Sequence, residues 1–79
     1  MIKPAQEQAF AMLANRLEHA RKEHPVFAQD TGHAVEVVFD EYQELKMAWL
    51  HDEGAARVID EALDVAATAM RLVMGEVQD

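Results

Sequence analysis

The stretch that decides the fold covers residues 34–64 and reads AVEVVFDEYQELKMAWLHDEGAARVIDEALD. Apolar residues recur in it at steps of three and four, which is the periodicity of amphipathic α-helices. The same stretch holds two short acidic clusters, Asp40-Glu41-x-x-Glu44 and Glu61-x-x-Asp64, separated by sixteen residues. Residues three apart on a helix have Cβ atoms roughly 5–6 Å from each other. Each cluster therefore presents two carboxylates side by side.

The periodicity predicts two helices, residues 34–50 and 53–74, joined by a turn so short that they must run antiparallel as neighbours. Asp52 is the expected N-cap of the later helix, and Gly75 is the expected stop. The stripe expected to face the core comprises Val35, Val38, Tyr42, Leu45 and Trp49, then Ile59, Ala62, Leu63, Ala66, Met70 and Val73. The carboxylates lie beside this stripe, so the clusters are expected to meet at the margin of the core.

Upstream, residues 5–22 predict a further helix, with Ala9, Phe10, Leu13, Leu17 and Ala20 on one face. It should end before Pro25, because the residue preceding a proline avoids the helical region. Asp30, Thr31 and Gly32 then offer candidate N-caps. The expected fold is all-α: one domain over residues 1–79, built as a helical hairpin plus an N-terminal helix.

The chain of 79 residues is small, and a domain of this size buries only about 60% of its unfolded surface. Its hydrophobic fraction is 51%, yet fourteen of those residues are alanine, which contributes little burial. We therefore expect a homo-oligomer, a dimer or tetramer, in which paired hairpins form a four-helix-bundle core.

The formal net charge is −8, and nine of the fifteen acids fall within residues 36–64. Binding to a nucleic-acid backbone is disfavoured by this charge. A polyphosphate substrate would be repelled as well, unless divalent cations neutralise the acids first. No apolar run approaches the ~18 residues that a membrane span needs, so no membrane partner is expected. The absence of cysteine favours a cytoplasmic location.

Facing each other across the hairpin, Glu41, Glu44, Glu61 and Asp64 would supply four hard oxygen ligands, the environment that Mg²⁺ or Mn²⁺ prefers. A solvated acidic face is the alternative, since charge runs usually face water. Two pairs on consecutive helices favour a metal site.

Several residues near the clusters have two interpretations. Arg57 and Arg71 share a helix face with Glu61 and Asp64, and they either form ordinary ion pairs or bind phosphate. His33 and His51 flank the acidic line as helix-end residues or as substrate contacts. Trp49 has the spacing of a packing residue, with stacking on a base as the alternative.

These residues together resemble the signature of the MazG-like all-α nucleoside triphosphate pyrophosphohydrolases, which is Glu-Glu-x-x-Glu, a spacer and Glu-x-x-Asp. Here it reads Asp40-Glu41-Tyr42-Gln43-Glu44, sixteen residues, then Glu61-Ala62-Leu63-Asp64. The following residues 65–71, VAATAMR, look like the small-residue continuation of members that hydrolyse purine deoxynucleotides. The resemblance covers residues 34–73, half of the chain.

The resemblance implies hydrolysis of a nucleoside triphosphate between its α and β phosphates, giving a monophosphate and pyrophosphate. It also implies that Glu41, Glu44, Glu61 and Asp64 bind Mg²⁺, which lowers the pKa of the attacking water. One carboxylate would in addition orient or deprotonate that water, and Glu41 and Glu44 are the candidates for this catalytic role.

Two features depart from the family pattern. Asp40 replaces the usual first glutamate, and the chain ends soon after the third helix, where many relatives continue with a further helix and basic residues. Either a partner subunit completes the pocket or activity is lost. The competing functions are a non-catalytic helical bundle that serves in interaction or regulation, and phosphoribosyl-ATP pyrophosphohydrolase, which shares the acidic signature.

Overall fold

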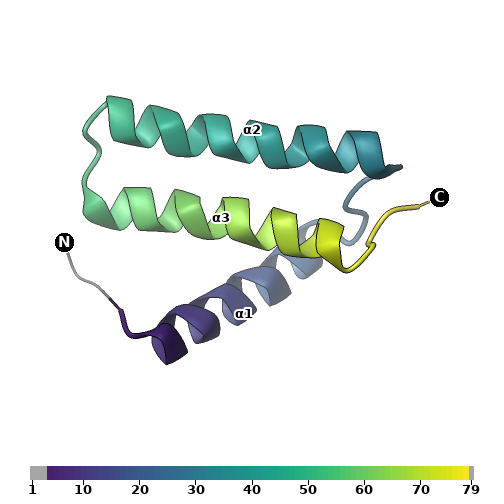
Figure 1. Cartoon of the computed structure of the whole chain (residues 1–79), viewed down its shortest axis with the longest axis horizontal. Helices are drawn as coiled ribbons and strands as arrows, with labels where there is room; N and C mark the ends of the chain where they lie inside the picture. Colours follow the sequence, from purple (N-terminus) through teal and green to yellow (C-terminus); the bar gives the residue numbers. More distant parts are fainter. Residues whose placement is uncertain (1–3, 79) are drawn as a thin grey trace.

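The computed structural model describes residues 4–78, which form three helices: α1 (Gln6–Glu23), α2 (Thr31–Leu50) and α3 (Ala55–Val73). Helices α2 and α3 lie side by side as an antiparallel hairpin, and α1 crosses α3 (Figure 1). The all-α prediction and the hairpin are confirmed. The predicted domain limits, residues 1 and 79, lie outside the described part. No helix within residues 4–78 is long and apolar enough to span a bilayer.

Local hydrogen bonds determine where α1 and α2 begin. The Asp30 side chain accepts a hydrogen bond of 2.8 Å from the His33 amide, so Asp30 is the N-cap and α2 starts at Thr31, before the predicted residue 34. At the start of α1, the Gln8 side chain accepts a 3.0 Å bond from the Ala5 amide. Both helices therefore have one of their free terminal donors satisfied.

The prediction that Asp52 caps α3 is wrong, because Asp52 instead ends α2. Its amide donates to the Trp49 carbonyl and the Glu53 amide donates to the Ala48 carbonyl, both at 3.1 Å. This pair of bonds is the Schellman motif, whose turning residue adopts a positive φ, here 51° at Asp52. Gly54 is then the N-cap, and α3 starts at Ala55.

Gly75 ends α3 in the same way, as the sequence predicts. Its φ is 69°, its amide donates to the Leu72 carbonyl and the Glu76 amide donates to the Arg71 carbonyl, both at 3.0 Å. The chain then turns back along the segment between α1 and α2, where the Gln78 amide donates to the Ala28 carbonyl at 3.1 Å. This motif thus carries the C-terminal residues to the end of α1.

The core differs from the predicted stripe. Of the residues predicted to face it, Trp49 is 68% exposed, Val35 53% and Val73 77%. The buried apolar residues are mostly small: Phe27, Ala28, Ala34, Ala48 and Ala67. Helix α2 is rotated so that alanines face α3, because small side chains let two helices approach closely and leave the large ones outside.

Two charged residues of α3 are buried, whereas Glu44 is exposed and Glu41 and Asp64 are half-buried. Glu61 is 4% exposed and Arg71 3% exposed, as deeply buried as the apolar core residues. The expectation that the site lies at the margin of the core is therefore wrong for Glu61. Burying a charge is costly unless the charge is paired or hydrogen-bonded, so Glu61 and Arg71 need polar partners in the interior.

Candidate metal centre

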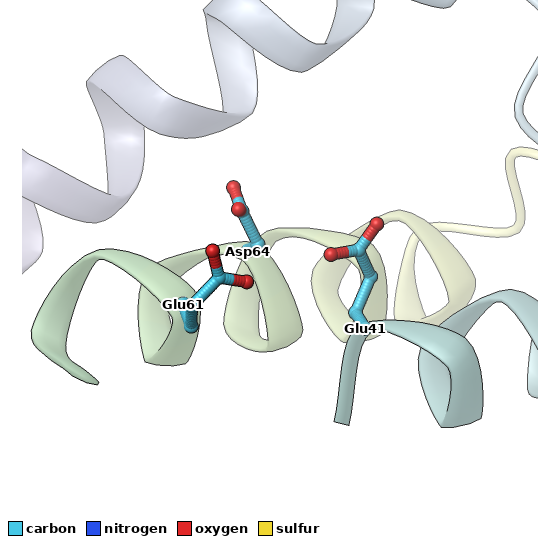
Figure 2. A group of neighbouring side chains, drawn as sticks. All are labelled: Glu41, Glu61 and Asp64. Carbon is cyan, nitrogen blue, oxygen red and sulfur yellow. The ribbon is translucent and has the colours of Figure 1, made fainter. Parts of the chain in front are cut away.

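Three of the four predicted ligands meet in the hairpin. Glu41 reaches from α2, while Glu61 and Asp64 project from successive turns of α3 (Figure 2). One carboxylate oxygen from each of these residues lies within 4.8 Å of the other two. The antiparallel turn places the two clusters at the same height, as the short connection predicts. Hard carboxylate oxygens at this separation suit Mg²⁺ or Mn²⁺.

Glu61 is the most buried member of the centre. One of its oxygens, Oε1, forms an ion pair with Nη2 of Arg57 at 2.7 Å, and its side chain is 5% exposed. The other, Oε2, is buried with no hydrogen-bond partner among the described residues. Burial raises the pKa of the Glu61 carboxyl, against the opposing effect of Arg57. An orphaned carboxylate oxygen beside two further carboxylates is the donor set that a divalent cation satisfies, so these residues fit a metal.

The pKa of the Glu41 carboxyl is raised as well. Its burial, followed by a hydrogen bond with Glu44 and repulsion from Glu44, Asp64 and Glu61, raises its pKa to about 7. Like charges held together favour the protonated form of one of them. A bound cation would reverse this effect.

The third carboxylate, Asp64, has a partner that the sequence did not single out. Arg16 of α1 donates from Nη1 to Asp64 Oδ1 at 2.6 Å and to the Asp60 carbonyl at 2.9 Å, and its Nη2 pairs with the Asp60 carboxylate. Burial lowers the pKa of Arg16, but its bonds with Asp64 and Asp60 outweigh this and raise it. One signal was available: Arg16 places a cation at the edge of the predicted apolar face of α1.

A cleft of about 790 Å³ opens beside these carboxylates and is lined by all three helices. Glu44 lines the cleft without belonging to the set of three close oxygens. Of the four predicted substrate-binding residues, Arg57 and Arg71 line it. The volume lies within the range of small-molecule sites, ~300–1000 Å³.

Arg71 occupies the wall of the cleft with its guanidinium already engaged. Its Nε donates to Glu76 at 2.9 Å and its Nη1 donates to the His24 carbonyl at 2.8 Å. The guanidinium also lies 4.9 Å from the centroid of the Phe27 ring, a cation–π distance. Arg71 thus joins the end of α1, the following segment and the C-terminal residues.

The two predicted histidines lie elsewhere. The Nδ1 of His33 accepts a 3.1 Å bond from the Gln29 amide at the start of α2. His51 ends α2, with its Nδ1 3.8 Å from a Glu53 carboxylate oxygen. Neither histidine lines the cleft.

Comparison with known protein families finds none that matches this chain. Comparisons with curated proteins and with solved structures likewise find no match.

Proposed function

We propose that this protein is a magnesium-dependent hydrolase that converts a nucleoside triphosphate or its deoxy form to the monophosphate and pyrophosphate. One observation carries the proposal: the buried, partnerless Oε2 of Glu61 lies in a carboxylate cluster with Glu41 and Asp64, at the edge of a nucleotide-sized cleft. The resemblance of the acidic motif to the MazG-like signature supports the same reaction.

In this proposal Glu41, Glu61 and Asp64 hold the Mg²⁺, with Mn²⁺ as a substitute. The ion supplies Lewis-acid polarisation of the phosphoryl oxygens and a lowered pKa for the attacking water. Glu44 lines the cleft outside the close set of oxygens, and besides its hydrogen bond with Glu41 its carboxylate can accept the proton of that water. Glu41 and Glu44 are thus the proposed catalytic pair.

The phosphates need positive charge in a protein of net charge −8. Arg57 lines the cleft with its side chain 52% exposed, so it can turn from Glu61 to a phosphate. Arg71 lines the cleft too, and a phosphate contact there would have to share a guanidinium already bonded to Glu76. We assign a phosphate contact to both arginines. Arg57 is the stronger candidate, because its side chain is more exposed than that of Arg71.

The proposed active form is a homo-oligomer, most simply a dimer. Helix α2 carries large apolar residues on its outer face, and these are at least 47% exposed: Val35, Phe39, Tyr42, Trp49 and Leu50. Pairing two hairpins through this face would give the four-helix core expected from the sequence.

A screen of nucleoside triphosphates with Mg²⁺, monitoring pyrophosphate release, tests the activity. We expect release with at least one triphosphate and its loss in Glu61→Gln. Glu36→Gln, which removes an exposed α2 carboxylate outside the cleft, should retain it. The proposal would be wrong if no triphosphate gave pyrophosphate and the unaltered chain bound neither Mg²⁺ nor Mn²⁺.

One observation favours a second candidate, a non-catalytic helical bundle for interaction or regulation. Arg16 pairs with Asp64, and Arg57 pairs with Glu61, so the acids are partly neutralised by the chain itself. Such a polar network could serve only to fix the helices. Calorimetric titration with Mn²⁺ separates the candidates, because only a metal centre predicts saturable binding that Glu61→Gln strongly weakens.

A further inference from the structure

Arg16 holds a position that neither the acidic motif nor its resemblance assigns. It is the α1 side chain that reaches the carboxylates, with 22% of the side chain exposed, and it lines the cleft. The three atoms that accept hydrogen bonds from Arg16 all belong to α3: the Asp60 carbonyl oxygen, an Asp60 carboxylate oxygen and Asp64 Oδ1. Arg16 therefore contacts a proposed metal ligand directly.

The Asp64 carboxylate cannot serve Arg16 and a divalent cation equally. The guanidinium is positive, so a cation bound through Asp64 would repel it across a few ångströms. Arg16 would keep its two acceptors on Asp60, which is not part of the close set of oxygens. Its Nη1 would lose the Asp64 contact and face the cleft.

We propose that Arg16 is a phosphate-contact residue, which exchanges Asp64 for the polyphosphate of the substrate when metal binds. This inference rests on the proposed function. Arg57 stands in the same relation to Glu61, which it contacts at 2.7 Å. A triphosphate on the metal would then be held from two helices, by Arg16 of α1 and Arg57 of α3. A guanidinium suits this role because its fork of donors matches phosphate oxygens.

The exchange gives Arg16 a signature that a purely structural arginine lacks. Removing its charge frees Asp64, so metal binding should be as tight as before or tighter. Polyphosphate binding should weaken, because a charge-assisted contact is lost. An arginine that merely positions Asp64 would weaken metal binding instead.

The test uses calorimetry on the full chain, first with Mn²⁺ alone and then with inorganic triphosphate in saturating Mn²⁺. Inorganic triphosphate avoids the unknown choice of base. For Arg16→Gln we expect Mn²⁺ affinity at or above that of the unaltered chain, and triphosphate affinity lower by about tenfold to a hundredfold. Lys22→Gln is the matched control, because it removes an α1 charge that pairs with exposed Glu18 outside the cleft. It should change neither affinity.

Circular dichroism checks that each variant is folded, and Arg16→Lys replaces Arg16→Gln if the latter does not fold. Lysine keeps the charge without the fork, so triphosphate affinity should fall by a smaller factor, about threefold to tenfold. Unchanged triphosphate affinity in the folded variant, or weakened Mn²⁺ affinity, overturns the role of Arg16 while leaving the metal centre intact. If the unaltered chain binds no Mn²⁺, the proposed function fails first and this inference falls with it.

Discussion

At the scale of single residues, Glu61 combines the deepest burial in the carboxylate cluster with an unsatisfied oxygen. We expect Glu61→Gln to lower Mn²⁺ affinity on the order of 100-fold or more, because a charged ligand is lost from the centre. The metal-free variant should unfold at or above the temperature of the unaltered chain, since a buried charge is removed. Calorimetry and thermal denaturation in a chelator measure the two effects.

Glu36→Gln serves as the control for that pair of measurements, since Glu36 is exposed on α2. It should leave both the Mn²⁺ affinity and the unfolding temperature unchanged. Undiminished Mn²⁺ affinity in Glu61→Gln would remove Glu61 from the ligand set.

Two carboxyl groups with opposite pKa shifts should give the metal-free protein a distinctive pH dependence. The pKa of Glu41 rises from 4.5 to about 7, so its favourable contribution is complete below pH 4.5 and is lost as the pH rises through 7. Bonds with Arg21 lower the pKa of Glu76, against its burial, and Arg71 adds to this. Its contribution is therefore present above pH 4.5 and lost at lower pH.

The free energy of unfolding in a chelator should thus decrease from pH ~5 to pH ~8. Urea denaturation across this range measures it, and Glu41→Gln should flatten the slope. A slope that is the same in both proteins would show that the pKa of Glu41 is not raised.

The pairing of Glu61 with Asp64 in the candidate metal centre was predictable because their spacing is local: residues three apart on one helix must share a side. Arg16 was not, because its partners Asp60 and Asp64 lie 44 and 48 residues further along the chain. Only the crossing of α1 over α3 brings them together. A cation at the edge of an apolar helix face was the sole local indication.

At the scale of elements, helix positions follow the periodicity, but the buried face does not. Val35, Tyr42 and Trp49 form the apolar line of α2, yet Ala34 and Ala48 face α3. A hydrophobic stripe predicts that a surface will be covered, and it does not say whether the same chain or another copy covers it. Alanine on an inner face is a weak signal because its burial contributes little hydrophobic free energy.

The turn between α2 and α3 gives a prediction about Asp52, whose φ of 51° is a conformation that side chains rarely adopt. A β-branched residue tolerates it worst, so Asp52→Val should lower the free energy of unfolding by about 1–2 kcal/mol. Asp52→Gly, the matched variant, should be neutral or stabilising, because glycine adopts positive φ freely. Chemical denaturation decides: equal stability of the two variants would mean that the turn is not a Schellman motif.

At the scale of the whole molecule, the chain exposes 5606 Å², whereas a monomer of this mass typically exposes about 4800 Å². The large apolar side chains on the outer face of α2 contribute to this exposed surface. We expect Trp49→Asp to shift the proposed dimer to monomer in sedimentation at micromolar concentration, because the buried charge would have no partner.

Met47→Asp is its matched control, two residues away and pointing about 200° around the helix. Both side chains are exposed, at 68% for Trp49 and 44% for Met47. The control should remain a dimer. If the unaltered chain sediments as a folded monomer of 8.9 kDa, the α2 face has another partner or none.

Helix α1 packs on α3 but not on α2, and this arrangement affects the order in which the helices fold. The α2–α3 hairpin forms from contacts close to its turn, whereas α1 must close longer loops to reach α3, so we expect α1 to dock last. Hydrogen exchange should then be faster in α1 amides than in the hairpin, most of all near Gln8, far from the contacts of Arg71 with the end of α1. Equal protection of all three helices would indicate a single cooperative unit. If α1 docks last, the wall of the cleft that carries Arg16 is completed in the final step of folding.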